Sequence, residues 1–221
     1  DLNYFKINLN TKWYFPLSRD QRWSFLTRLQ AGYGNGYGTV NGHDQVLPFQ
    51  ENFRAGGSDT LRGFETNIVG PRAVFRSSTP VLSTPNPDGS AGCCLGVDHD
   101  FVTVSQRSVG GNAMVLGGLE LIVPTPFLDE GYSNSVRSSF FVDVGNVWDT
   151  EFNVDDYRDL APVEFAKIND FSDINGYRAS AGLSVQWLSP MGPMIFSFAK
   201  TLKKEEGDDT KFFSFNIGST F

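Results

Sequence analysis

Apolar and polar residues alternate along much of this chain with a period of two. In the first such run, Phe5, Ile7 and Leu9 occupy one face while Lys6 and Asn8 occupy the other. Successive side chains of a β-strand point to opposite faces of its sheet, so each run predicts a strand with one apolar and one polar face. The predicted strands are residues 3–17, 22–33, 112–124, 136–149, 177–189, 192–203 and 211–221.

The length of these strands separates two kinds of β-protein. Strands of soluble proteins commonly have about 5–6 residues, whereas a tilted strand that crosses a bilayer needs about 9–11. The polar faces carry small hydrophilic residues, which suit a water-filled lumen, and aromatic residues stand near strand ends, where membrane barrels place aromatic girdles. These aromatic residues are Trp13, Trp23, Tyr33, Trp148, Trp187 and Phe221. The pattern therefore predicts an all-β fold, a transmembrane antiparallel β-barrel. The alternative is a soluble lipocalin-like barrel with its apolar face inward.

Composition argues against a helical membrane protein and against a nucleic-acid-binding protein. Of the 221 residues, 40% are hydrophobic and the mean hydropathy is −0.24. No apolar run reaches the about 18 residues that would predict a transmembrane helix. The net charge of −7 and the pI near 4.8 disfavour nucleic acid as a partner, because its phosphates attract basic surfaces.

Two connections are much longer than the others. Residues 39–111 exceed ordinary loop lengths, which indicates a functional segment or one folded in its own right, and residues 149–176 form an acidic insert. Outer-membrane barrels have long extracellular loops and short periplasmic turns, so the long loop is expected outside. Single-chain bacterial barrels have an even number of strands. We therefore expect residues 1–221 to be the C-terminal part of a longer barrel, with the other strands upstream of Asp1.

The long loop carries a motif that points to the lumen. Leu61 and Phe64 bracket Arg62 and Gly63, and a solvated loop gains nothing from exposing such apolar residues. We expect the loop to tuck into the barrel, where Arg62 pairs with Glu120 or Asp143 on the predicted inward faces. An arginine–carboxylate pair is bidentate and directional, so it can pin a loop. The alternative is a surface loop with a solvated arginine.

Metal and redox chemistry have few candidate residues. Cys93 and Cys94 are adjacent, and His43 and His99 are the only histidines, so zinc-ligand spacing is missing and no metal site or cofactor is expected. Cys93 and Cys94 either close a disulfide or remain thiols.

Catalysis has no paired motif either. No nucleophile stands with a base, so the chain is not expected to be an enzyme. The acidic doublets Asp155-Asp156 and Asp208-Asp209 offer oxygen ligands for Ca²⁺, but solvated loops are the favoured interpretation.

An ordered series of short motifs runs through nearly the whole chain. It comprises residues 47–49, 51–53, 55–57, 61–64, 70–74, 110–114, 124–127, 134–137, 140–149, 186–193 and 215–218 with Phe221. In this series the chain resembles the BamA family, the outer-membrane-protein assembly factors of Gram-negative bacteria. Leu61-Arg62-Gly63-Phe64 matches the family's loop motif.

The resemblance implies a sixteen-stranded barrel preceded by periplasmic POTRA domains. Residues 1–221 would hold the last seven strands and the sixth extracellular loop, whereas the POTRA domains and the N-terminal strands would be absent. In the family, lumen carboxylates at positions that match Glu120 and Asp143 hold the loop arginine. The family often has two spaced cysteines in this loop, and the adjacent Cys93 and Cys94 depart from that.

The resemblance also implies a function without bond-making chemistry. The family's first and last strands pair weakly, so a lateral seam opens and client barrels fold and insert there. Gly218 matches a glycine where the family's last strand kinks; the alternative is a lumen-facing glycine that makes room for a neighbour. Phe221 would also serve as the C-terminal signal of outer-membrane barrels.

The implied setting is the bacterial outer membrane, in which the protein is integral. The implied partners are nascent outer-membrane proteins, outer-membrane lipids and, through the missing parts, the accessory lipoproteins of the Bam complex. Two other functions remain open: a relative that secretes a dedicated partner or assembles autotransporters, and a passive porin.

Overall fold

A computed structural model describes residues 3–19, 22–40, 42–81, 96–125, 135–157, 168–190 and 192–218, with the side chains of residues 76–81 and 96–103 left aside. Its main element is a seven-stranded antiparallel sheet, ordered β1-β2-β7-β8-β9-β10-β11. The strands are β1 (Tyr4–Pro16), β2 (Ser24–Gly36), β7 (Ala113–Val123), β8 (Val136–Trp148), β9 (Arg178–Ser189), β10 (Gly192–Lys203) and β11 (Phe213–Ile217). The seven predicted strands are confirmed, although the last begins at Phe213 and not at residue 211, and residues 219–221 lie outside the described ranges.

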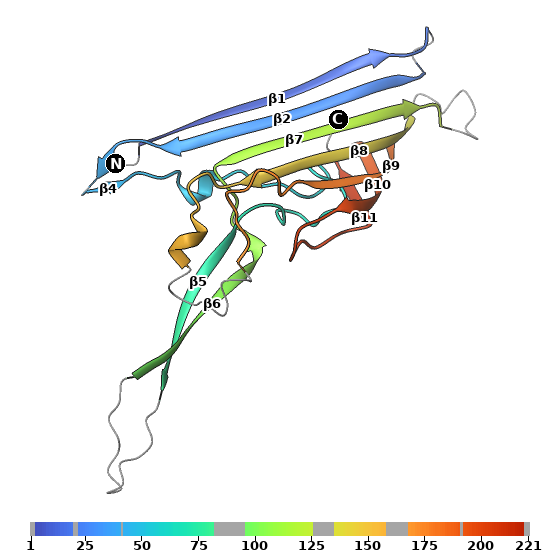
Figure 1. The fold of residues 1–221 in the computed structure, drawn as a ribbon. Coiled ribbons are helices and arrows are strands. Elements are labelled where there is room, and N and C mark those ends of the chain that lie inside the picture. Colours follow the sequence, from blue (N-terminus) through green and yellow to red (C-terminus); the bar gives the residue numbers. More distant parts are fainter. Residues whose placement is uncertain are drawn as a thin grey trace, which may run out of the picture.

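The sheet is curved, as Figure 1 shows: β1, β2, β7 and β8 run side by side, and β9, β10 and β11 continue the sheet around one end. Few residues separate β1 from β2 and β9 from β10, and both pairs meet at the same end of the strands. Strands β1 and β11 are the two edges of the sheet. The sheet therefore has the form of a barrel wall that does not close within this chain.

The alternation of side chains sets the two faces of this wall. On the outer face Leu119, Phe140 and Val142 are between 46% and 54% exposed, whereas on the inner face Glu120 and Asp143 are buried. Apolar side chains thus cover the outside, as a lipid-facing wall requires. The soluble barrel with an inward apolar face is therefore the wrong alternative.

The connection between β2 and β7 is folded, as expected for its length. It contains β3 (Thr39–Val40), β4 (His43–Asp44), the short 3₁₀ helix η1 (Phe49–Glu51) and a hairpin of β5 (Arg72–Val81) and β6 (Gly96–Ser108). The hairpin projects away from the sheet, while the segment before it lies inside the sheet's curve (Figure 1).

The inner segment of this connection forms the main apolar core with the wall. Phe53, Ala55, Leu61, Phe64, Ile68 and Val69 are buried together with Met114, Leu116 and Val147 of β7 and β8. The prediction that the inward face carries small hydrophilic residues therefore fails at Met114, Leu116 and Val147. The sheet presents apolar side chains inward where the loop covers them.

A smaller core joins the base of the hairpin to the insert between β8 and β9. Buried Ile168 packs with Val74, Val104, Phe152, Val154 and Tyr157, and the insert contains the short 3₁₀ helix η2 (Val154–Tyr157). Within the described ranges, no helix is long and apolar enough to span a membrane.

Candidate functional site

Arg62 lies at the centre of the loop's contact with the sheet. Its Nε and Nη2 donate to the two carboxylate oxygens of Asp143 at 2.7 and 3.0 Å, and its Nη1 donates to Glu120 Oε2 at 3.1 Å. Arg62 and Asp143 are both 0% exposed. The structure thus brings together the three residues that the alternation and the loop motif single out, in the bidentate geometry that fixes direction as well as distance.

A second arginine, which the sequence analysis did not assign, shares the same carboxylate. Arg28 of β2 is buried, and its Nη2 donates to Asp143 Oδ1 at 2.8 Å. The cluster of Arg28, Arg62, Glu120 and Asp143 therefore holds two positive and two negative charges. That balance matters because a buried charge without a partner is strongly destabilising.

Strand register explains how Arg28 reaches Asp143. Arg28 lies opposite Gly118, and Gly118 lies opposite Asp143, so the three form one row across β2, β7 and β8. A Cβ on Gly118 would stand 2.8 Å from Asp143 Oδ1 and 3.0 Å from Arg28 Nε. Glycine in the middle of the row thus leaves the space in which the two charged side chains meet.

Neighbouring side chains support both ends of the ion pair. The Arg62 guanidinium lies 3.5 Å from the centre of the Phe141 ring, a cation–π contact, and Ser139 Oγ donates to Glu120 Oε1 at 2.6 Å. Burial alone would lower the pKa of Arg62, but the hydrogen bonds and negative charges of Asp143 and Glu120 outweigh it and raise that pKa. The arginine is therefore a permanent cation in this site.

The backbone of the motif is fastened to the following strands. Ser180 Oγ of β9 donates to the Arg62 carbonyl, and Thr201 Oγ1 of β10 donates to the Gly63 carbonyl at 3.1 Å. Gly63 has φ +89°, and a Cβ there would lie 3.1 Å from Cβ atoms of Ala199 and Ser180. Only glycine combines this conformation with so close an approach to the wall.

A third buried arginine, Arg178, forms a separate network, nearer the ends of the strands. Arg178 of β9 donates from Nε to Asp208 Oδ2 at 2.8 Å and from Nη1 to Asn146 Oδ1 at 2.7 Å. Asp208, in the β10–β11 connection, is 4% exposed and also accepts the Glu205 backbone N–H at 2.9 Å. The interpretation of Asp208 as a solvated loop residue is therefore wrong, because the connection folds over Arg178. Asp155, Asp156 and Asp209 are exposed.

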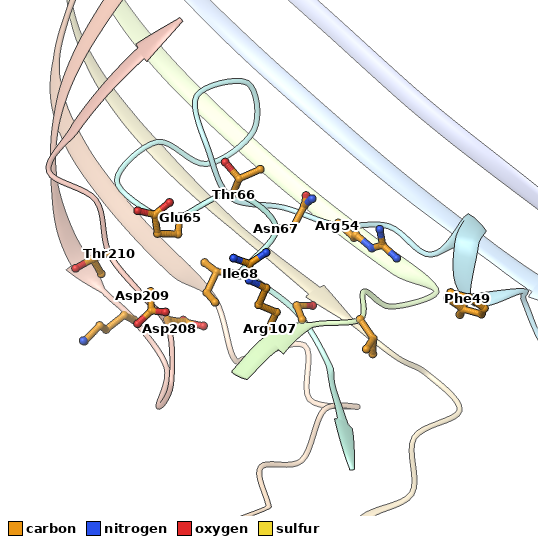
Figure 2. Close-up of a pocket in the computed structure, with 13 residues that line it drawn as sticks. Phe49, Arg54, Glu65, Thr66, Asn67, Ile68, Arg107, Asp208, Asp209 and Thr210 are labelled. Carbon is orange, nitrogen blue, oxygen red and sulfur yellow. The ribbon is translucent and has the colours of Figure 1, made fainter. Parts of the chain in front are cut away.

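A cavity of about 1080 Å³ opens between the loop and the β10–β11 connection (Figure 2). Its charged lining residues are Arg54, Arg107 and Lys204 with Glu65, Asp208 and Asp209. The lining carries charges of both signs, and Asp208 among them is already paired with Arg178, so the cavity has no cluster of one sign that would select an anion or a cation. In the described part of the chain, no cluster of His, Cys, Asp or Glu residues has the arrangement of a metal site.

Gly218 follows the last strand in a backbone conformation that favours glycine. Its φ is +85°, its N–H donates to the Pro193 carbonyl at 2.8 Å, and, chain neighbours aside, no atom of the described residues lies within 4 Å of an added Cβ. The positive φ itself favours glycine at this position, because a side chain with a Cβ is strained in it. Phe221, Cys93 and Cys94 lie outside the described residues.

Comparison with known proteins gives the family and the fold. The model of the Omp85 superfamily domain matches residues 1–221. The chain is 30% identical over 226 residues to the outer membrane protein assembly factor BamA of Neisseria meningitidis serogroup B, covering 100% of this chain and 24% of that protein. A crystal structure of BamA from Haemophilus ducreyi lacking POTRA domains 1–3 matches with a TM-score of 0.74 and 35% identity, over 99% of this chain and 35% of the other.

Two statements follow from these matches. The sheet has the fold of the outer-membrane β-barrels to which it is similar, and the chain lies in the outer membrane as part of an integral protein. The chain also spans only about a quarter of the length of the Neisseria relative.

Proposed function

This chain belongs to the Omp85 superfamily, and from that premise we propose that it is part of a factor that folds β-barrel proteins and inserts them into the outer membrane. The similarity to two BamA proteins supports this proposal. Its proposed clients are nascent outer-membrane proteins, and its proposed partners are the accessory lipoproteins of the Bam complex and outer-membrane lipids. The proposed work is strand pairing rather than bond-making chemistry.

The observation that carries the mechanism is the short last strand. Strand β11 has five residues, whereas its neighbour β10 has twelve, and the two pair only from Met194–Ile217 to Phe198–Phe213. The other side of β11 is a sheet edge. An edge strand presents unpaired N–H and C=O groups that can template another strand. We propose that a client strand adds to this edge at a lateral seam.

We propose that the Arg62 loop keeps the inner face of the sheet packed while a client strand pairs at the seam. The loop covers the inner face of β7 and β8 with an apolar core, and its arginine is fixed to Glu120 and Asp143. A lumen filled in this way favours an assembly factor over a passive porin, which needs an open aqueous path.

Photocrosslinking in living cells tests this proposal. The full-length protein would carry p-benzoylphenylalanine in place of Phe215 on β11 or, as the matched control, in place of Phe140 on β8. Both are outward, half-exposed phenylalanines, at 44% and 54%, but β11 is an edge strand, whereas β8 lies between β7 and β9. We expect adducts with newly made barrel proteins at position 215 and not at position 140.

Each other outcome has a meaning. Equal adduct levels at the two positions would contradict the seam. Adducts with one secreted, non-barrel protein would instead support the secretion relative.

A further inference from the structure

The loop that carries Arg62 also contacts the last strand. Asn216 of β11 donates from Nδ2 to Ser58 Oγ at 3.2 Å and to Asp59 Oδ1 at 3.1 Å. Asn216 is on the half-buried inner face of β11, between the outward side chains of Phe215 and Ile217. Ser58 and Asp59 lie only a few residues before Arg62, so one short stretch of loop reaches two different parts of the wall.

The chain that leads into β11 is also paired with this loop. The Lys211 N–H donates to the Gly63 carbonyl at 3.0 Å, and the Glu65 N–H donates to the Asp209 carbonyl at 3.1 Å. Phe64 and Thr210 form an antiparallel bridge between these bonds. Residues 63–65 and 209–211 therefore act as a short two-stranded ladder that ends two residues before β11 begins.

Hydrogen bonds within the loop hold its two ends together, so its two contacts with the wall belong to one compact turn. Thr60 Oγ1 accepts the Gly56 N–H at 2.9 Å and donates to the Gly56 carbonyl at 3.0 Å, and the Gly57 N–H donates to the Phe64 carbonyl at 3.1 Å. These bonds join the two ends of residues 56–64 into one turn. One side of the turn holds Asp143 through Arg62, and the other side holds Asn216.

We infer that residues 56–65 are a clamp that holds the last strand to the wall, with Asn216 as its positioning residue. Five residues of pairing with β10 are little to fix a strand, and isolated short pairings are marginal. The clamp adds side-chain and backbone bonds on the inner side of β11 and leaves its outer edge available. Only the purpose of the clamp rests on the proposed function. That purpose is to set how readily β11 moves at the seam.

Amide hydrogen exchange on the full-length protein in lipid vesicles tests the clamp without relying on activity. In Asn216→Asp a second carboxylate would face Asp59 in place of the amide donor. We expect exchange in residues 211–218 to accelerate by about five- to tenfold, the loss of one or two hydrogen bonds. The matched control is Ser214→Ala, on the same face of the same strand, which should change exchange less than twofold.

An exchange of partners provides a rescue. In the double variant Asn216→Asp with Asp59→Asn, an amide donor again faces a carboxylate, so protection of residues 211–218 should return. A simple packing role for Asn216 would not be rescued by changing Asp59. Asn216→Ser is the second variant, in case the added charge prevents folding.

Client insertion measured on the same samples separates the two proposals. Faster exchange with unchanged insertion supports the clamp and contradicts the seam. Unchanged exchange overturns the clamp, whatever happens to insertion. Faster exchange in Asn216→Asp without rescue by Asp59→Asn also overturns the assignment of Asn216 and Asp59 as partners.

Discussion

The two buried arginine networks attach loops to the wall with the charges of loop and strand reversed. At Arg62 the loop supplies the cation and the strand β8 supplies the carboxylate, Asp143. At Arg178 the strand β9 supplies the cation and the β10–β11 connection supplies the carboxylate, Asp208. Both pairs are bidentate, and in both cases one partner lies on a strand of the sheet and the other on a connection. The comparison teaches that the wall carries fixed charges of both signs, to which two different loops attach.

The networks differ in how their charges are balanced. Asp143 serves two arginines, and Glu120 completes a cluster of four charges. Asp208 pairs with Arg178, and Arg72 of the hairpin lies farther away, 4.0 Å from Asp208 Oδ1. The first cluster therefore depends on each of its members, whereas the second depends mainly on one pair. The following predictions test that difference, from the largest expected effect to the smallest.

Arg62→Glu should have the largest effect. The new carboxylate would stand beside Asp143 and Glu120 in a buried site, and removing one partner of a buried ion pair alone costs about 3–5 kcal/mol. We expect a fall of at least that size in the free energy of unfolding of the full-length protein in vesicles, measured by urea titration, and loss of client barrels from outer membranes. Arg62→Lys keeps the charge but not the bidentate geometry, so its free energy of unfolding should fall less. Wild-type stability and assembly in Arg62→Glu would contradict the role of this network.

Asp208→Asn should come next, with Asp209→Asn as the matched control. The neutral amide would leave Arg178 buried beside a weaker acceptor, and we expect a loss of about 2–4 kcal/mol in the same titration. The adjacent Asp209 is exposed, so its substitution should leave the urea midpoint unchanged. Equal effects at the two positions would mean that Asp208 is not the residue that fastens the β10–β11 connection.

A feature of this molecule could be predicted from the sequence when the residues that determine it lie close together along the chain. The period of two predicted all seven strands of the sheet and the inward positions of Glu120 and Asp143, because alternation is a local property. The apolar neighbours of Arg62 predicted a buried loop for the same reason. These features needed no knowledge of which strands are adjacent.

The features that sequence analysis missed depend on partners distant in the chain. Arg28 is one of several polar residues on its strand, and only the register of β2 with β7 and β8 brings it to Asp143. Asp208 and Asp209 are chemically identical neighbours, and only the fold of the connection decides which of them meets Arg178. The pairing of β11 with β10 reaches Ile217, next to the positive φ of Gly218, which alternation alone does not reveal.

Gly118→Ala should have an intermediate effect, and Gly117→Ala is its control. An added methyl group at Gly118 would press on Asp143 and Arg28, whereas at Gly117 the nearest atom is 3.7 Å away, an ordinary contact. Overpacking of this kind costs about 1–3 kcal/mol, and we expect that loss in Gly118→Ala alone. An unchanged free energy of unfolding in Gly118→Ala would contradict the claim that Arg28 and Asp143 need a glycine between them.

Gly218→Ala should have the smallest effect on stability. A left-handed conformation costs an L-residue with a Cβ about 1–2 kcal/mol, and the described residues around Gly218 add no clash. Gly218→Asn should lose less, because asparagine tolerates this conformation. Equal losses for alanine and asparagine would contradict the assignment of Gly218 to the backbone turn.

A double-mutant cycle between Arg62 and Asp143 tests the central claim most directly, that this pair fastens the loop to the wall. The variants Arg62→Met and Asp143→Asn, alone and together, would be compared by the free energy of unfolding of the full-length protein in vesicles. We expect the double variant to lose less than the sum of the single variants by at least about 1 kcal/mol, because each single substitution already breaks the same interaction. Additive losses, within about 0.5 kcal/mol, would contradict the claim that the loop is held by this pair.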